Sequence, residues 1–176
     1  MKINKELASQ IELLILDVDG VLTDGSLFYD NNGQEYKAFN SRDGHGLRML
    51  QDAGVKVAIL TGRKSELVQH RANNLNIPAE LVFQGFRDKR PAFEALLAHT
   101  GIPAHKIAYV GDDVIDLPVM TKVGLAIAVA DAHPFVQEHA HWISNRPGGR
   151  GAVRETCEML LDARGELQAI LDRYLQ

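Results

Sequence analysis

The sequence has little cysteine, no long apolar run and no excess of positive charge. Cys157 is its single cysteine, so an intramolecular disulfide is excluded, and we expect this residue to lie semi-buried on a helix. No apolar run reaches the roughly 18 residues that a membrane-spanning helix needs, so we expect no membrane partner. A net charge of −4 gives no indication of nucleic-acid binding.

The first apolar run ends in aspartates and lacks a small-residue cleavage site, so it predicts folded structure and not a signal peptide. Hydrophobic residues make up 45% of the 176, which is enough for one domain to bury a core. We therefore expect a single domain over residues 1–176 and a cytoplasmic location.

Short apolar runs alternate with segments of helical periodicity along the chain. The apolar runs predict strands buried on both faces, and the periodic segments predict helices between them. This alternation is typical of an α/β protein in which helices cover both faces of a parallel sheet. Strands are expected at residues 13–18, 55–60, 80–83, 106–111 and 124–130, and helices at residues 44–54, 64–76, 90–101 and 116–124.

Residues 26–40 interrupt this alternation. Two short β-like runs flank the pair Asn32-Gly33, and Asn-Gly is a strong hairpin signal, so an inserted β-hairpin is expected here. A helix and a short strand are expected within residues 131–144, followed by a glycine-rich turn. From Ala152 to about Gln176 we expect helix, with residues 165–176 as a weakly constrained tail.

Polar side chains follow three of the predicted strands, and a lysine begins a predicted helix. Because parallel strands end at one edge of a sheet, these groups are expected to converge there. Several have ordinary structural explanations, since Thr61 and Asp112 can cap helices and Lys89 can be a solvated surface charge. The explanation is weakest for Asp17, which follows a buried apolar run. The set comprises Asp17, Asp19, Thr61, Lys89, Asp112, Asp113 and Asp116.

Neighbouring carboxylates repel each other, and burial makes each one more costly. A cation held between Asp17 and Asp112 would remove the repulsion, and oxygen ligands favour Mg²⁺. A carboxylate nucleophile, Mg²⁺, a lysine and a hydroxyl are the groups that phosphoryl transfer needs. In this interpretation Asp17 attacks phosphorus, while the metal, Lys89 and Thr61 hold the phosphoryl oxygens.

These motifs resemble a known family. "DVDGVLTDG", "LTGRK", the downstream Lys89 and "GDDVIDLP" match, in order, the four motifs of the haloacid dehalogenase (HAD) superfamily of phosphatases. Further segments such as "NNGQEYKAFNSRDGHGLR", "VADAHP" and "GGRGAVRE" resemble its small enzymes for sugar-acid phosphates. The resemblance extends from about Ile11 to about Asp162, and it implies a Rossmann-like HAD fold without a cap domain.

The resemblance also implies roles for individual residues. Asp17 would be nucleophile and metal ligand, and Asp112 would be a further ligand of Mg²⁺. Asp19 would be the general acid and base, and its backbone carbonyl would bind the metal. Asp113 and Asp116 would orient the metal waters or the motif lysine.

Thr61 and Lys89 would bind the transferring phosphoryl group. Extra charge around Lys89 leaves Arg87 and Arg90 as less favoured identities for the motif lysine. Arginines suit a substrate that carries both a carboxylate and a phosphate. The implied substrate contacts are Asp19, Asn40, Ser41, Arg42, Asp43, Gly44, Arg48, Arg63, Arg71 and Lys89.

The hairpin predicts a homo-oligomer. A lone two-stranded hairpin is marginal in water, and this one carries apolar side chains on both arms. The resemblance implies a homotetramer in which neighbouring subunits replace the missing cap. The apolar side chains are Leu27, Tyr29, Tyr36 and Phe39.

Three other functions fit part of the pattern. A signalling receiver domain uses similar residues, but in another order, and it has no place for Asp19. A non-catalytic HAD oligomerisation module would have lost Asp17, Asp19 or Lys89, which are all present. A HAD phosphatase for another sugar phosphate or a nucleotide stays open, because a pocket shared between subunits is not legible in one chain.

Overall fold

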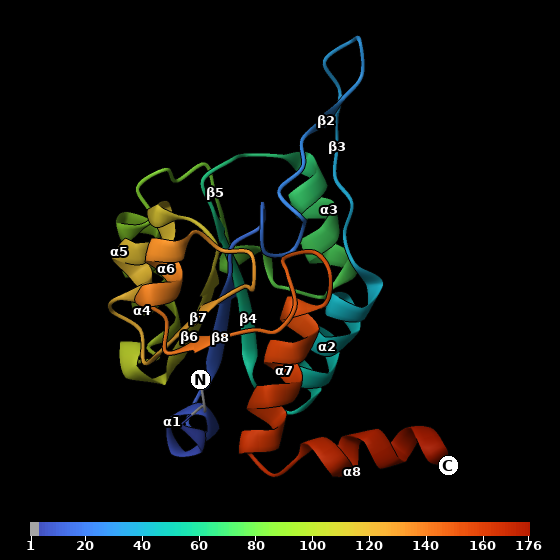
Figure 1. Ribbon diagram of the computed structural model, residues 1–176, viewed down its shortest axis with the longest axis vertical. Coiled ribbons are helices and arrows are strands. Elements are labelled where there is room, and N and C mark those ends of the chain that lie inside the picture. Colours follow the sequence, from blue (N-terminus) through green and yellow to red (C-terminus); the bar gives the residue numbers. More distant parts are fainter. Residues whose placement is uncertain (1–3) are drawn as a thin grey trace.

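The computed structural model describes residues 4–176 and contains a six-stranded parallel sheet between two layers of helices (Figure 1). The order of the strands is β5-β4-β1-β6-β7-β8, and each neighbouring pair is parallel. The expected α/β sheet is therefore confirmed. Its strands are β1 (Leu13–Leu16), β4 (Lys56–Thr61), β5 (Val82–Gln84), β6 (Ile107–Gly111), β7 (Leu125–Ala128) and β8 (Trp142–Ile143).

Helices cover both faces of this sheet (Figure 1). One face carries α2 (Ser41–Asp52), α3 (Glu66–Asn74) and α7 (Ala152–Ala163), and the other carries α4 (Arg90–Thr100), α5 (Leu117–Met120) and α6 (Pro134–Glu138). The shorter helices are α1 (Lys5–Ser9), α8 (Leu167–Asp172), η1 (Ala79–Leu81), η2 (Ala104–Lys106), η3 (Val114–Asp116) and η4 (Arg173–Leu175). Among residues 4–176, no helix has the length and apolar character needed to cross a bilayer.

The central strand β1 fixes the position of the candidate site. All four residues of Leu13–Leu16 are fully buried, and β4 and β6 pair with its two edges. From β1 the chain moves outward through β4 to β5, and then returns to β6 on the other side of β1. The carboxyl end of β1 is therefore a topological switch point, where α/β proteins bind ligands.

The expected hairpin is present between β1 and α2. Phe28–Tyr29 (β2) pairs antiparallel with Glu35–Tyr36 (β3), and the pair rises beyond the carboxyl end of the sheet (Figure 1). The Asp30 carboxylate accepts hydrogen bonds from two backbone N–H groups of the turn, at 2.9 and 2.8 Å. Gly33 has a φ of 78°, which glycine adopts without strain.

The C-terminal segment differs from the expected continuous helix. Gly165 has a φ of 73°, a left-handed conformation that ends α7, and α8 then runs in a new direction (Figure 1). Ile170 of α8 is 8% exposed, so the turn lets this segment dock an apolar side chain. The sequence also did not predict α1, where Lys5 forms an ion pair of 2.7 Å with Asp162 of α7.

Candidate active site

The carboxyl ends of β1, β4 and β6 surround a small pocket of about 180 Å³. A larger hollow of about 350 Å³ lies at the opposite end of the sheet, near Lys56 and Thr100. No carboxylate cluster lines that hollow. The smaller pocket has one, so it is the better candidate for an active site. The residues that line the smaller pocket are Asp17, Asp19, Thr61, Gly62, Arg63, Asp112, Asp113 and Ile115.

Asp17 continues the pairing of β1 by one residue. Its backbone N–H donates to the carbonyl of Val110 at 3.1 Å, and its Oδ1 accepts from the Val18 N–H at 2.7 Å. The residue is 4% exposed. No hydrogen bond from residues 4–176 reaches its Oδ2, so one oxygen is fixed and the other is available.

Lys89 reaches Asp17 from below the pocket. It is fully buried at the start of α4, and its Nζ lies 3.0 Å from Asp17 Oδ1 and 2.6 Å from Asp116 Oδ1. It also donates to the hydroxyl of Tyr109 at 2.9 Å. Burial lowers the pKa of Lys89, but attraction from the two carboxylates outweighs burial and raises it overall. The ammonium therefore stays charged beside Asp17.

Asp116 uses both carboxylate oxygens in hydrogen bonds. Its Oδ1 accepts from Lys89 at 2.6 Å and from the Tyr109 hydroxyl at 2.6 Å. Its Oδ2 accepts from the backbone N–H groups of Asp112 and Asp113, at 3.0 and 3.2 Å. The expected contact between Asp116 and Lys89 is thus present, and Asp116 also shapes the loop that carries Asp112.

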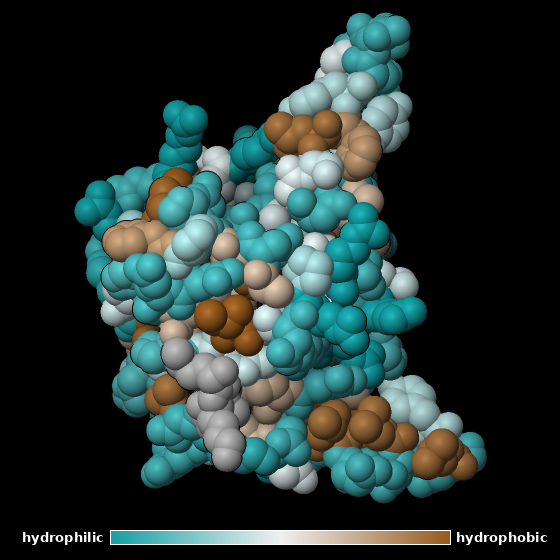
Figure 2. Space-filling view, in the orientation of Figure 1, coloured by the Kyte–Doolittle hydropathy of each residue, from teal (hydrophilic) through white to brown (hydrophobic). Residues whose placement is uncertain are grey.

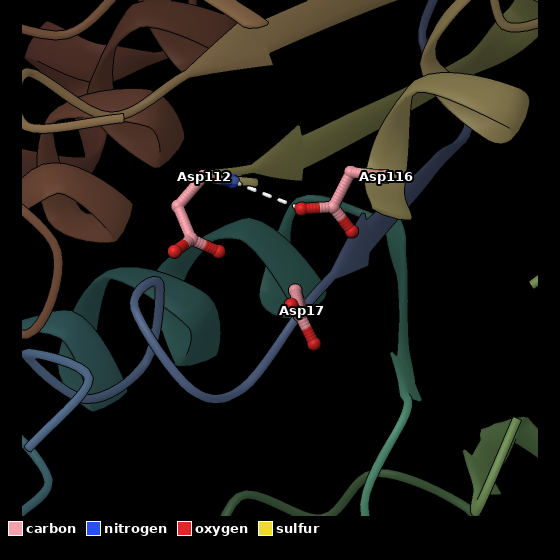
Figure 3. A group of neighbouring side chains, drawn as sticks. All are labelled: Asp17, Asp112 and Asp116. Atoms are coloured by element: carbon pink, nitrogen blue, oxygen red, sulfur yellow. Dashed lines mark hydrogen bonds between the residues drawn. The ribbon is translucent and has the colours of Figure 1, made fainter. Parts of the chain in front are cut away.

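Three carboxylates form a group that could hold a metal ion (Figure 3). Oxygens of Asp17, Asp112 and Asp116 lie within 4.8 Å of one another. Because the oxygens of Asp116 are already bonded, Asp17 and Asp112 are the better ligands. Asp112 Oδ1 is buried without a hydrogen-bond partner among the described residues, which is the state expected of an oxygen that binds a cation.

The electrostatics of the pair agree with a cation site. Burial raises the pKa of Asp17 to about 7, and the carboxylate of Asp116 adds to the shift. Burial also raises the pKa of Asp112 to about 8, with further contributions from Asp116 and Asp17. A divalent cation between these hard oxygen donors would offset both effects, so the residues present fit Mg²⁺.

Gly20 allows the first loop to approach Asp112. Its φ is 95°, and a Cβ at this position would lie 2.1 Å from Asp112 Oδ2. Any other residue at this position would push against the carboxylate. Glycine is therefore needed at this position of the first motif for steric reasons, which the motif alone did not reveal.

Asp19 lies at the side of the pocket, under the hairpin. Its carboxylate forms an ion pair with Lys37, which sequence reasoning missed. Lys37 also lies 3.3 Å from Glu35, and Glu35 in turn accepts from Arg63 at 2.7 Å. Tyr109 was missed too, although a tyrosine within a buried strand signals a hydroxyl that needs a partner.

Among the arginines expected to contact substrate, Arg63 lines this pocket. Arg71 is half-buried, and its Nη2 donates to the carbonyl of Asn40 at 3.2 Å. Its guanidinium lies over the ring of Phe39 at 5.5 Å. Burial lowers the pKa of Arg71, against the attraction of Asp43.

The other expected substrate contacts lie outside the pocket in this chain. The Asp43 carboxylate accepts from the backbone N–H groups of Gly151 and Arg154, at 3.3 and 2.8 Å, and so caps α7. Asn40 caps α2, and Arg42 lines a separate hollow. Their contact with substrate stays a prediction, as it does for Ser41, Gly44 and Arg48 on α2.

The chain matches the family model of haloacid dehalogenase-like hydrolases over residues 79–152. It is 52% identical to the 3-deoxy-D-manno-octulosonate 8-phosphate phosphatase KdsC of Salmonella typhi, over 91% of this chain and 84% of that protein.

Two solved structures are similar over almost their full length. A probable YrbI family phosphatase from Pseudomonas syringae has a TM-score of 0.95 at 46% identity, covering 98% of this chain and 97% of the other. The 3-deoxy-D-manno-octulosonate 8-phosphate phosphatase of Moraxella catarrhalis, in complex with magnesium, phosphate and KDO, has a TM-score of 0.93 at 38% identity, with 97% of each chain covered.

The parallel sheet with acidic motifs after β1 and β6 is the arrangement of a haloacid dehalogenase-like hydrolase. Identity near one half across most of both chains narrows this class further. The chain belongs to the 3-deoxy-D-manno-octulosonate 8-phosphate phosphatase family of these hydrolases.

Proposed function

We propose that this protein is a Mg²⁺-dependent phosphatase that hydrolyses 3-deoxy-D-manno-octulosonate 8-phosphate to 3-deoxy-D-manno-octulosonate (KDO) and inorganic phosphate. The observation that carries the proposal is the pairing of a free Asp17 oxygen with an unpartnered Asp112 oxygen, beside the buried Lys89. The family supplies the substrate, and this places the reaction in lipopolysaccharide precursor biosynthesis.

Asp17, Asp112 and the backbone carbonyl of Asp19 would hold the metal. When bound, Mg²⁺ supplies positive charge that offsets the charge of the phosphoryl group in the transition state. Asp17 attacks phosphorus with one carboxylate oxygen and forms an aspartyl-phosphate, while Val18 and Lys89 hold Oδ1 and so fix the orientation of the carboxylate.

Asp19 acts as general acid and then as general base. As the phosphorus–oxygen bond breaks, its carboxyl group gives a proton to the leaving sugar oxygen. In the second step its carboxylate takes a proton from the water that attacks the aspartyl-phosphate. Thr61 and Lys89 hold the transferring phosphoryl group. Lys89 supplies positive charge, and its hydrogen bond to Asp116 keeps the ammonium in place.

The protein would act as a homo-oligomer, most simply a homotetramer, in the cytoplasm. Support comes from four large side chains on the hairpin that are each about half exposed: Leu27, Phe28, Tyr29 and Tyr36. Burying this surface against other copies would stabilise the hairpin and would cover the open pocket, which has no cap.

A phosphatase assay across phosphate esters tests the proposal. Purified protein with Mg²⁺ is given the eight-carbon sugar-acid phosphate, other sugar phosphates and nucleotides, and kcat/KM is compared. We expect the highest kcat/KM for the sugar-acid phosphate. A higher value for a nucleotide or a neutral sugar phosphate would replace the substrate but keep the chemistry, while absence of any turnover would end the proposal.

A further inference from the structure

Lys37 is an unusual residue of the hairpin because its side chain is buried. The neighbouring Tyr36 is 54% exposed, whereas the side chain of Lys37 is 1% exposed. A lysine ammonium is costly to remove from water unless anions surround it. Here the anions are the carboxylates of Asp19 and Glu35, so the ion pairs account for the burial.

Glu35 is held in place from its other side. Arg63 Nη2 donates to Glu35 Oε1 at 2.7 Å and to the hydroxyl of Tyr29 at 2.7 Å. Arg63 belongs to the loop after β4 and lines the pocket, while Tyr29 and Glu35 belong to paired arms of the hairpin. These contacts fix the base of the hairpin and leave Lys37 directed at Asp19.

Asp19 depends on Lys37 for its orientation. Its side chain is 20% exposed, and Lys37 Nζ bonds to its Oδ1. Among residues 4–176, its Oδ2 accepts no hydrogen bond from a side chain. One oxygen is therefore anchored, while the other remains free to carry the proton that the reaction moves.

We propose that Lys37 is a positioning residue, which holds the Asp19 carboxyl group toward the leaving oxygen of the substrate. This inference rests on the proposed function, because Asp19 is the group that transfers the proton. Lys37 keeps its own protons throughout: Asp19 Oδ2 gives its proton to the sugar oxygen and later takes one from water. The hairpin would thereby affect the rate of proton transfer by Asp19, although no hairpin residue gives or takes a proton.

The physical cost of losing Lys37 would be orientational. An unanchored carboxyl group samples several rotamers, and only one faces the leaving oxygen. We expect kcat for the sugar-acid phosphate to fall by roughly 10- to 100-fold, which is less than most of the roughly 10²- to 10⁴-fold that general acid catalysis contributes, because the acid itself is retained. An aryl phosphate has a better leaving group that needs less protonation, so its first step should fall by less than about threefold.

The first experiment compares Lys37→Met, Lys37→Arg and the control Lys106→Met. Lys106 forms an ion pair of 2.6 Å with Glu12 at the opposite end of the sheet, so its replacement removes the same charge and an ion pair outside the site. We expect Lys37→Met to lower kcat and to change KM little. The loss in kcat should be larger for the sugar-acid phosphate than for the aryl phosphate. Lys37→Arg should recover part of the loss, and Lys106→Met should match wild type.

The second experiment places Lys37→Met in an Asp19→Asn background and measures release of the sugar acid from the sugar-acid phosphate in a single turnover. If Lys37 acts through Asp19, the added substitution should change the rate by less than about twofold. An equal loss in both backgrounds, or equal losses for both substrates, would overturn the inference. Circular dichroism and mass confirm that each variant is folded and assembled.

Glu35→Gln provides a second test if Lys37→Met fails to fold. It retains Lys37 but weakens the support of its ammonium, so we expect a smaller loss with the same dependence on leaving group. A Glu35→Gln loss without that dependence would contradict the inference. An active wild type with an unimpaired Lys37→Met overturns the inference alone, whereas an inactive wild type overturns the proposed function and the inference with it.

Discussion

The floor of the pocket and the hairpin above it are built in opposite ways. The floor, defined as Asp17, Lys89, Tyr109 and Asp116, is almost entirely buried, and hydrogen bonds and ion pairs within one chain hold its polar groups apart from Asp17 Oδ2. The hairpin, residues 26–40, rests on two-residue strands and the ion pairs at its base. The proposed catalytic groups thus come from a single chain, while we expect closure of the pocket to need a partner surface.

The surfaces of the two regions differ accordingly. Figure 2 shows apolar colour on the hairpin where it leaves the body of the molecule. Phe28 and Tyr36 lie opposite each other in the ladder and are 51% and 54% exposed. Cross-strand apolar pairs of this kind stabilise a hairpin only in part, and a partner surface would complete their burial.

The largest effect should come from the floor. Asp17→Asn replaces the nucleophile by an amide, and we expect kcat to fall by about 10⁴-fold or more without loss of fold. The control is Asp162→Asn, an exposed aspartate that pairs with Lys5. Turnover is measured in a homogeneous preparation, and substantial activity of Asp17→Asn would rule out the covalent mechanism.

Metal exchange should have an effect of similar size. EDTA should remove activity, and added Mg²⁺ should restore it, because within residues 4–176 Asp112 Oδ1 has no hydrogen-bond partner that could replace a cation. Ca²⁺ should fail to support turnover, since its larger coordination shell would move Asp17 away from phosphorus. Equal turnover with Ca²⁺ and Mg²⁺ would contradict a small octahedral site.

Two glycine substitutions can distinguish an effect on metal affinity from an effect of backbone strain. Gly20→Ala forces a methyl group against Asp112, whereas Gly33→Ala, at a φ of 78° in the hairpin turn, meets nothing within 4 Å. Both should lose about 1 kcal/mol of stability, because alanine disfavours a positive φ. Only Gly20→Ala should weaken Mg²⁺ activation, by roughly 10- to 100-fold. Equal weakening in both variants would show that the close approach is unimportant.

The hairpin should control assembly more than chemistry. The double substitution Phe28→Ser with Tyr36→Ser removes exposed apolar surface, so we expect it to lower the mass measured by light scattering toward the 19.4 kDa of one chain. The control is Phe135→Ser, at a residue of α6 that is 49% exposed. Activity should fall more on the sugar-acid phosphate than on an aryl phosphate. A wild type that is monomeric at micromolar concentration would end the idea.

The smallest effect should come from Tyr109→Phe. The change removes one hydroxyl that accepts from Lys89 and donates to Asp116, so the ammonium is held less firmly. We expect a loss of about 1–2 kcal/mol in unfolding free energy and about tenfold in kcat. Tyr174→Phe, at a residue that is 61% exposed, serves as the control. An unchanged kcat would mean that Asp116 alone positions Lys89.

The sequence was sufficient for features that depend on local pattern. Buried apolar runs identified the parallel strands, and the Asn32-Gly33 pair identified the hairpin. The convergence of Asp17, Thr61 and Asp112 followed from the geometry of a parallel sheet. Each of these needed only spacing and the common direction of the strands.

Features that depend on tertiary contacts were not legible. Asp112 and Asp116 have the same charge, and the hydrogen bonds that Asp116 accepts in the folded chain distinguish the bonded carboxylate from the free one. In the sequence, Lys37 resembles an exposed lysine at the end of a hairpin arm, and its contact with Asp19 forms only when the two loops fold together. Asp43 caps a helix more than a hundred residues further along the chain.

The central position of β1 has a consequence for folding. β1 lies near the beginning of the sequence, yet its Leu13 pairs with Ile107. The backbone N–H of Asp17 bonds to the carbonyl of Val110. Until β6 has been synthesised and docked, one edge of β1 stays open, and the backbone of Asp17 is not fixed. Strand pairing between distant segments is slow because the entropy of closing the loop is lost before the stabilising contacts form. We therefore expect the pairing of β1 with β6 and the fixing of the proposed nucleophile to occur together, so that a chain lacking this pairing has no reactive centre.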